Sequence, residues 1–304
     1  MGTSSLVIVG TMAIDALETP FGKEESVFGG SASYAAYAAS FFHPTSIISI
    51  VGQDFPDEYR RLLETRRIDL SHVEVHAGST FRWRGRYGAD LNVAETLETQ
   101  INVLKDLHPK WDGKQTPEYL FLANVDPNAQ LELLDQLERP RIKFVAADTM
   151  NFWIQSARPA LSKVLARIDM LVVNDGEARL LTKENSLIRA ARKIQAEGPS
   201  IVVIKKGEHG VMLFHEERFF VLPAYPLEEV FDPTGAGDTF GGALIGYLVR
   251  EGKTDFETFC RAVSYGTVVA SFTVEKFGLD RLKALTLPEI EERLKQFRQI
   301  CKIP

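Results

Sequence analysis

The stretch "VFDPTGAGDTFGGALIGYL", residues 230–248, joins a loop of small residues to the start of an apolar helix. Gly235, Ala236 and Gly237 form the loop, and the helix is predicted to begin at Asp238. Backbone N–H groups in such a loop attract an anion, and the positive end of the helix dipole adds to the attraction. Yet Asp238 is itself an anion. The simpler interpretation is that Asp238 only complements the helix dipole.

A carboxylate at this position has a chemical use in phosphoryl transfer. It can take a proton from a hydroxyl group while the neighbouring amides stabilise charge on the phosphoryl oxygens. We therefore predict that Asp238 is a general base and that the amides of Gly235, Ala236 and Gly237 form an anion hole. Two other phosphate motifs are absent from the sequence: G-x-x-x-x-G-K-[ST], and G-x-G-x-x-G after the first apolar run.

The rest of the chain alternates short apolar runs with helical patterns. The runs are too continuous for half-exposed strands and too short for helices, so we predict strands that are buried on both faces. This alternation favours one α/β domain over residues 1–304, with a mostly parallel sheet and helices on both faces. The runs are 6–10, 46–52, 119–124, 143–148, 169–174 and 201–205, and the helical patterns are 31–42, 57–66, 129–138, 160–167, 186–197, 238–250, 256–274 and 288–300.

The segment "STFRWRGRYGAD", residues 79–90, follows a different pattern. Aromatic residues alternate strictly with Arg82, Arg84 and Arg86, which predicts a strand with one apolar side outside the main sheet. We expect a small β lid at about 70–100, with partner strands around 72–75 and 92–98. The arginine side either faces solvent or contacts substrate or a second subunit.

Polar residues stand where the predicted strands end. In an open α/β sheet, ligands bind beyond the carboxyl ends of the strands, so these residues predict the rim of a site. Asp and Asn also cap helices, which is the simpler interpretation for any one of them. The residues are Asp15, Asn124, Asp126, Asp148, Asn151, Asn174, Glu177 and Lys205.

Composition excludes several functions. The formal charge of −6 argues against nucleic-acid binding, which needs a basic surface. The two cysteines, Cys260 and Cys301, are too few for a disulfide scaffold and lack metal-site spacing. The first ten residues lack a basic segment, and their apolar run is too short for a signal peptide or a membrane span. We expect a cytoplasmic protein that does not bind membranes.

Four motifs resemble the ribokinase/PfkB-type carbohydrate kinase family, in the order in which that family has them. "DPTGAGDTFGGALIGYL" resembles its D-T-x-G-A-G-D signature, and "FGGSASYAAYAAS" (28–40) resembles its N-terminal signature. "VVNDGEARLL" (172–181) is similar to its N-x-x-E element, and "VVIKKGEHG" (202–210) to its T-x-G-x-x-G nucleotide segment. The resemblance covers residues 6 to about 280, nearly the whole chain.

This resemblance implies a ribokinase-like three-layer α/β fold with a β lid, and a kinase that depends on ATP and Mg²⁺. The first hypothesis is a sugar kinase, which transfers the γ-phosphoryl group to a sugar hydroxyl. The alternative is a nucleoside kinase of the same family, with aromatic residues stacking on the base. A third hypothesis is a regulator that binds nucleotide or sugar without catalysis. The lid also forms dimers in some relatives, so a homodimer through the lid is expected.

Site roles carry over from the family motifs residue by residue, and the strand-end and lid patterns add Asn124 and Arg82. The implied catalytic residues are Asp238 and the loop Gly235, Ala236 and Gly237. The expected substrate-binding residues are Asp15, Gly29, Gly30, Tyr34, Arg82 and Asn124, and the nucleotide-binding residues are Asn174, Glu177, Lys205, Gly207 and Thr267. Glu177 would hold Mg²⁺ through water, and Asp232, Thr234, Thr273 and Gly278 would surround a monovalent cation such as K⁺.

The chain departs from the family pattern at three places. Tyr34 replaces an Asn that touches the sugar in many relatives, so substrate contacts are expected to differ. Lys205 and Lys206 replace Thr-Leu; Lys205 either meets a phosphate or is an ordinary strand end. Pro233 removes one amide donor beside the cation loop.

Overall fold

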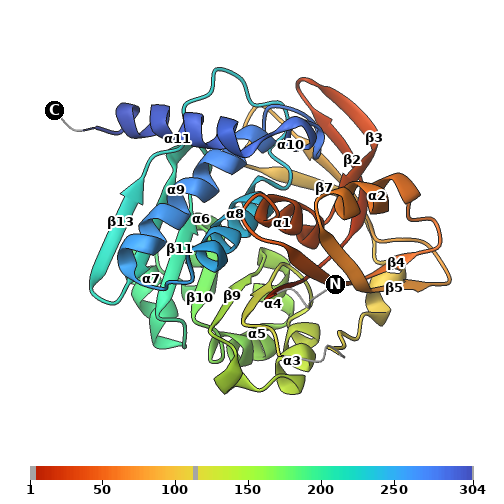
Figure 1. Cartoon of the computed structure of the whole chain (residues 1–304), viewed down its shortest axis with the longest axis horizontal. Helices are drawn as coiled ribbons and strands as arrows, with labels where there is room; N and C mark the ends of the chain where they lie inside the picture. The colour runs from red at the N-terminus through yellow and green to blue at the C-terminus, as the bar shows by residue number, and fades with distance from the viewer. Residues whose placement is uncertain (1–4, 112–115, 303–304) are drawn as a thin grey trace.

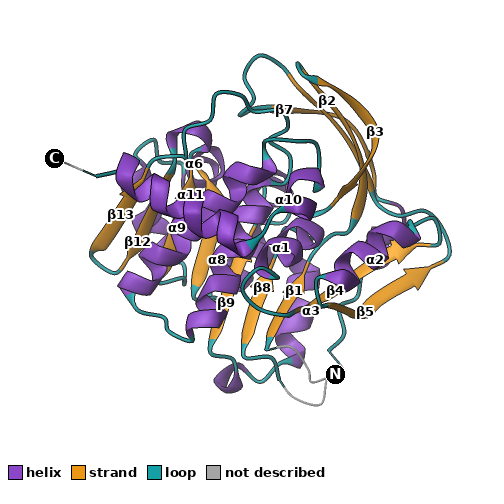
Figure 2. Cartoon of the chain, turned by 45° about the horizontal axis from the view of Figure 1, so that its top comes forward, coloured by secondary structure: helices purple, strands orange, loops and turns teal. Residues whose placement is uncertain are grey.

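The computed structural model describes residues 5–111 and 116–302, and its main feature is a nine-stranded sheet. Neighbouring strands from β11 to β5 are parallel, and β12 and β13 extend one edge in antiparallel fashion. Figure 2 shows this sheet between two layers of helices. In spatial order the strands are β13 (Arg218–Leu222), β12 (Val211–His215), β11 (Ile201–Lys205), β10 (Met170–Asn174), β9 (Phe144–Asp148), β8 (Tyr119–Leu122), β1 (Leu6–Val9), β4 (Thr45–Gly52) and β5 (Ile68–His76).

Helices cover both faces of this sheet, as the alternation of strand residues dictates. In β1, Leu6 and Ile8 join one hydrophobic cluster, while Val7 and Val9 join the other. One face carries α1 (Ser31–Ala39), α2 (Asp57–Thr65), α8 (Ala236–Glu251), α9 (Phe256–Thr273), α10 (Asp280–Ala284) and α11 (Leu287–Ile300). The other carries α3 (Pro127–Gln136), α4 (Asn151–Ser156), α5 (Arg158–Leu165), α6 (Asp175–Thr182) and α7 (Leu187–Ala196) (Figure 1). The predicted three-layer fold is therefore confirmed.

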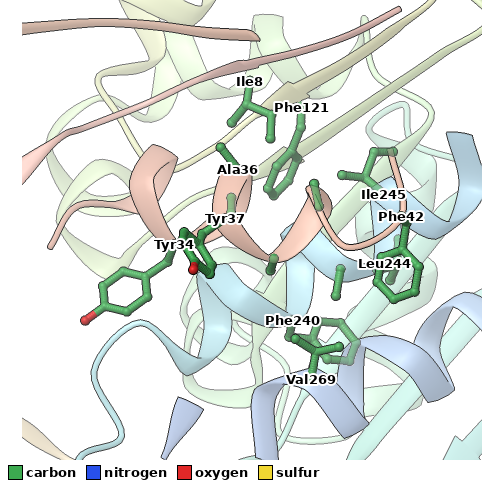
Figure 3. Close-up of a cluster of buried hydrophobic side chains, with 14 of the residues drawn as sticks. Ile8, Tyr34, Ala36, Tyr37, Phe42, Phe121, Phe240, Leu244, Ile245 and Val269 are labelled. Carbon is green, nitrogen blue, oxygen red and sulfur yellow. The ribbon is translucent and has the colours of Figure 1, made fainter. Parts of the chain in front are cut away.

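Helices α1 and α8 pack unusually closely because small residues face each other. A β-carbon on Gly242 would lie 2.0 Å from the carbonyl oxygen of Ala35, and one on Gly246 would lie 2.7 Å from Cα of Ala39. Figure 3 shows the two helices side by side, with their larger side chains filling the cluster around them. The contact ties the helix after the Gly29–Gly30 turn directly to the helix that begins at the predicted anion hole.

A separate four-stranded sheet forms the lid, in the order β3 (Gly22–Gly29), β2 (Ala13–Thr19), β6 (Arg82–Tyr87) and β7 (Ala94–Gln100). The expectation that residues 72–75 pair within the lid is wrong, because they belong to β5 and pair with β4. Leu70 and Val73 pack against the main core, which holds β5 in the large sheet. The lid instead takes residues 13–29, whose strand character the sequence pattern did not reveal.

The arginines of β6 lie on the lid face opposite the predicted site. Asp15 and Trp83 are register partners in parallel strands, so their side chains share one face and Arg82, Arg84 and Arg86 share the other. The guanidiniums are occupied by carboxylates of neighbouring segments. Arg82 pairs with Asp54 at 2.8 Å, Arg84 with Glu25 at 3.6 Å, and Arg86 with Glu18 at 3.2 Å and Glu95 at 3.7 Å. The pairing of Arg82 with Asp54 does not support the expected substrate contact, which stays a prediction.

Within residues 5–111 and 116–302, no helix combines the length and the apolar character that crossing a bilayer requires.

Candidate active site

The predicted anion hole is the start of α8. Gly235 adopts φ 73°, which glycine tolerates readily, and a β-carbon there would lie 2.5 Å from the Tyr34 ring. No side chain caps the N-terminus of α8. The amide of Ala236 donates to the carbonyl of Pro233 at 3.2 Å, so it is partly engaged within the loop. Among the three amides, those of Gly235 and Gly237 are thus the better candidates for binding an anion.

Two buried carboxylates, one from the core and one from the lid, share this site. Burial and the nearby Asp148 raise the pKa of Asp238 to about 7. Burial, Asp232 and Asp238 raise the pKa of Asp15, on β2, to about 8. Asp15 is 5% exposed, and its buried Oδ1 has no hydrogen-bond partner among the described residues. A bound hydroxyl compound would satisfy Asp15 and be available to Asp238 as base.

The Gly29–Gly30 turn makes room for Asp15. A β-carbon on Gly29 would lie 1.9 Å from Oδ2 of Asp15, and one on Gly30 would lie 2.4 Å from the carbonyl oxygen of Thr11. Gly30 also has φ 96°. These glycines therefore leave room for the carboxylate and close the strand-to-helix turn, and their contact with substrate stays a prediction.

Tyr34 supplies the floor of the site. Its side chain is 1% exposed, and its buried hydroxyl has no partner among the described residues. Burial, Asp232 and Asp15 hold the pKa of this hydroxyl well above its usual range. In Figure 3 the hydroxyl is directed away from the other labelled side chains. Tyr34 thus offers a neutral hydroxyl donor beside Asp15 and Asp232.

Trp83 forms an aromatic wall beside Asp15. Its indole packs over the backbone of Gly85, where a β-carbon would lie 2.0 Å from the ring, and its Nε1 donates to Thr96 at 3.1 Å. The side chain remains partly exposed. The arrangement fixes the ring and leaves part of it accessible on the face of the lid that carries Asp15.

Asn124 is held by its own neighbours. Its side-chain oxygen accepts from Nε1 of Trp153 at 3.1 Å, and its carbonyl accepts from the Ser31 hydroxyl at 2.8 Å. The hydroxyl of Ser31 in turn accepts from the amide of Thr11 at 3.1 Å. These bonds connect the ends of β8 and β1 to α1, so the structure gives Asn124 a structural task at the place where the sequence predicts substrate contact.

A cavity of about 930 Å³ lies beside the anion hole, a volume suited to a nucleotide. Its walls are the lid loop 89–92, the turn 207–210 after β11, the start of α8, and α9. The structure brings Lys205, Gly207 and Thr267 together at this cavity, and their contact with a nucleotide stays a prediction. The Thr267 hydroxyl donates to the carbonyl of Val263, and its side chain lies in the cavity wall.

Asn174 and Glu177 form a capping box at the start of α6. The Glu177 carboxylate accepts from the Asn174 amide at 2.7 Å, and Asn174 Oδ1 accepts from the Glu177 amide at 2.8 Å. Burial and the nearby Asp148 raise the pKa of Glu177 to about 7 against the opposing effect of Lys205. Capping therefore explains the spacing of these residues, and the carboxylate still lies among the charged groups of the site.

Lys205 reaches from the end of β11 across β10 to Asp148 at the end of β9. Its Nζ lies 2.9 Å from Asp148 Oδ2, and both side chains are largely buried. Burial lowers the pKa of Lys205, but the carboxylates of Asp148 and Glu177 outweigh it and the pKa is raised. The sequence placed Asp148 on the rim of the predicted site without a specific role, and its position at the end of a buried strand was the signal for it.

The expected cation loop is organised around Asp232, which is 1% exposed. Its carboxylate accepts from the amides of Thr234 at 2.9 Å and Gly278 at 3.0 Å, which brings these two predicted residues together. The side chain of Thr273 does not join this group, because its hydroxyl donates to Thr239 between α8 and α9. Of the four residues predicted around the cation, the loop therefore brings together Asp232, Thr234 and Gly278.

Contacts between the lid and the core flank the site on both sides. The rings of Phe21 and Phe231 lie 4.8 Å apart, and Thr234 Oγ1 donates to Tyr87 OH at 3.1 Å. On the nucleotide side, Asn92 Nδ2 donates to Glu208 Oε1 at 3.4 Å. The lid thus spans from the cation loop to the nucleotide turn.

The sequence is similar to those of known kinases. A model of the pfkB family of carbohydrate kinases matches residues 4–284. The cytidine kinase of Thermococcus kodakarensis is 30% identical over 246 residues, which are 80% of this chain and 88% of that protein.

Solved structures share the fold over nearly their whole length. The Burkholderia thailandensis nucleoside kinase in complex with inosine is 20% identical, has a TM-score of 0.79, and covers 96% of this chain and 98% of its own. An E. coli protein described as a ribokinase II, in complex with ATP and Mg²⁺, is 21% identical with a TM-score of 0.77, over 97% of this chain and all of its own. The family inferred from the motifs is confirmed. The chain belongs to the pfkB family of carbohydrate kinases, which are phosphotransferases with an alcohol group as acceptor.

Proposed function

We propose that the chain transfers the γ-phosphoryl group of ATP to a ribose hydroxyl of a nucleoside. The observation that carries this choice is the pairing of Asp15 with Trp83 on one face of the lid. Asp15 offers an unpartnered acceptor for a sugar hydroxyl, and the fixed indole offers a surface for a planar base. The similarity to a cytidine kinase supports the same choice.

The chemistry follows from the placement of Asp238. The carboxylate takes the proton of the acceptor hydroxyl, whose oxygen forms a bond to the γ-phosphorus as the bond from that phosphorus to the β-phosphate oxygen breaks. The amides of Gly235 and Gly237 stabilise charge on the transferred oxygens. Asp15, Gly29, Gly30 and Tyr34 orient the acceptor. Lys205, Gly207 and Thr267 border the nucleotide, with Asn174 and Glu177 near its phosphates.

Two ions belong to this proposal. In kinase sites magnesium usually keeps several waters and binds one or two carboxylates together with the phosphates of the nucleotide, where it neutralises charge. Glu177 provides such a carboxylate, acting through water, and the E. coli neighbour holds ATP with Mg²⁺. A monovalent cation would be held by the loop around Asp232, whose buried carboxylate receives only neutral amide donors among its recorded hydrogen bonds. We propose K⁺ there.

Three further expectations stay predictions. Residues 1–304 would act as one domain, in the cytoplasm. A homodimer would form through the lid, whose arginine-bearing face is available for it.

Turnover of ATP by the purified protein with Mg²⁺, across nucleosides, pentoses and hexoses, tests the proposal. We expect activity with nucleosides and a Trp83→Ala variant whose KM for the nucleoside rises about tenfold, a loss typical of one stacked base. The Asp238→Asn variant should lower kcat by roughly 10²–10⁴, the usual range for a general base, while it still binds ATP. Activity confined to free sugars would instead support the sugar kinase. ATP binding without turnover of any acceptor would support a non-catalytic regulator.

A further inference from the structure

Lys205 is the cation of a site that is otherwise crowded with carboxylates. Asp15, Asp148, Glu177, Asp232 and Asp238 surround the start of α8, and their electrostatic effects on one another record this proximity. Among the described residues that line the nucleotide cavity, Lys205 carries the one basic side chain, whereas Asp90 and Glu208 add negative charge. Because ATP is itself an anion, the negative charge of its phosphates must be balanced by positive charge in this cavity.

The position of Lys205 is set by two independent contacts. Its Nζ lies 2.9 Å from Asp148 Oδ2, across strand β10. The same nitrogen lies 3.0 Å from the place that a β-carbon on Gly237 would occupy. Gly237 therefore leaves space for the ammonium group directly above the anion hole. A larger residue in the loop would push the lysine away from the amides that are proposed to bind the transferred phosphoryl group.

The Lys205 ammonium has two carboxylates with which it could pair, Asp148 and Asp238. Lys205 is close enough to feel the charge of both Asp148 and Asp238. If the ammonium paired with Asp238, it would stabilise the carboxylate and weaken it as a base. Asp148 is 5% exposed and sits at the end of a buried strand, so it cannot follow the lysine elsewhere. The ion pair holds the ammonium beside Gly237.

We propose that Asp148 is a positioning residue that holds the Lys205 ammonium over Gly237, where it contacts the transferred phosphoryl group instead of neutralising Asp238. This inference rests on the proposed kinase function and adds two assignments to it. Lys205 acts on the γ-phosphoryl group specifically, and Asp148 sets the position of Lys205 in addition to its direct effect on the pKa of Asp238.

The test compares Lys205→Met, Asp148→Asn and the double variant with Lys206→Met, a matched control on the adjacent residue. Binding of ADP and of a non-hydrolysable ATP analogue is measured for each, with kcat and thermal stability. Because one preorganised charge donor contributes about 10²–10³ in kcat, we expect Lys205→Met to lose that factor. We also expect it to bind the ATP analogue at least tenfold more weakly while ADP affinity stays within twofold. Lys206→Met should match the wild type in all measurements.

The double variant separates a catalytic pair from a structural one. Each single substitution leaves one buried charge unpaired and should lower Tm, whereas the double variant removes both charges and should recover Tm. We expect its kcat to remain as low as that of Lys205→Met, and Lys205→Arg to recover part of kcat. Recovery of both Tm and kcat in the double variant would overturn the inference, as would an unchanged ratio of ATP-analogue to ADP affinity in Lys205→Met.

The nucleotide affinities and Tm do not depend on the identity of the acceptor, whereas kcat does. If no acceptor is phosphorylated by the wild type, the proposed function fails, and the ratio of the two nucleotide affinities still reports whether Lys205 contacts the γ-phosphoryl group. If the wild type is active and Lys205→Met keeps its kcat and its ATP-analogue affinity, the kinase function stands and this inference fails.

Discussion

The main sheet and the lid sheet are stabilised by different interactions. The strands of the main sheet are buried on both faces, so β1, β8 and β9 are apolar along most of their length. In the lid, β7 is exposed at every position and the first part of β3 is exposed as well. The lid is held instead by strand pairing, surface ion pairs and a few contacts with the core. Residues that need fixed geometry, such as Asp238, belong to the core, whereas Asp15 and Trp83 belong to the lid.

The same substitution in the two regions gives the largest expected contrast. Gly242→Ala places a β-carbon 2.0 Å from the backbone oxygen of Ala35, so α1 and α8 must separate. We expect a loss of about 3 kcal/mol in the free energy of unfolding, at the upper end for overpacking a core. Gly88→Ala, in the lid, has no atom within 4 Å of its new β-carbon and should change stability by less than about 0.5 kcal/mol. Urea unfolding measures the free energy of unfolding of both variants, and equal losses would contradict the expected difference between core and lid.

The pH dependence of activity reports on the core-borne base. Asp238 must be ionised to accept a proton, and its pKa is raised to about 7. We expect kcat/KM to fall about tenfold for each pH unit below 7, since a base acts only in its deprotonated form. Initial rates at a series of pH values, with the enzyme checked for retained folding, measure this. A profile that stays flat to pH 5 would contradict the assigned role or the assigned environment of Asp238.

Asp15, on the lid, should lower the stability of the folded protein when its buried carboxyl group ionises. Its folded-state pKa of about 8 lies above the ordinary 3.8, so the folded protein binds the additional proton. The stability due to Asp15 is present below pH 4 and is lost as the pH rises toward 8. We expect Asp15→Asn to raise the free energy of unfolding by about 1–3 kcal/mol at pH 8, with little change at pH 4. Thermal unfolding at both pH values checks this, and destabilisation at pH 8 would contradict it.

The arginine face of the lid is expected to have the smallest effect on activity. The side chains of Arg84 and Arg86 are 40% and 46% exposed, and their partners are exposed carboxylates. Because water screens such pairs, the double Ala variant should lose less than about 1 kcal/mol of stability. It should also keep the wild-type KM for the acceptor. Its mass in solution sharpens the comparison, because a fall to half the wild-type mass would show that this face joins two subunits.

The sequence predicted the main sheet well because burial on both faces leaves a strong pattern. It predicted only half of the lid, since "GKEESVFG" in β3 is mostly polar and its strand character depends on pairing with β2. Residues 68–76 of β5 alternate as an edge strand does, which is why part of them was assigned to the lid.

In the site, the loop before Asp238 was predictable from its glycines and its acid. The role of Asp148 was not, because it depends on a lysine 57 residues away that reaches over an intervening strand. The arginines of β6 were misleading for a related reason. Alternation reveals that Arg82 and Trp83 lie on opposite faces, but only the pairing of Trp83 with Asp15 reveals which face looks inward.

The tight contact between α1 and α8 has a consequence for how this enzyme can change over evolution. With Gly242 pressed against Ala35, α1 and α8 keep a fixed relative position, so the start of α1 and Asp238 are inherited as an aligned unit. The lid strands β2 and β6 lie outside that body and carry Asp15 and Trp83. New acceptors can therefore be accommodated by exchanging residues of the lid, while the catalytic base keeps its alignment.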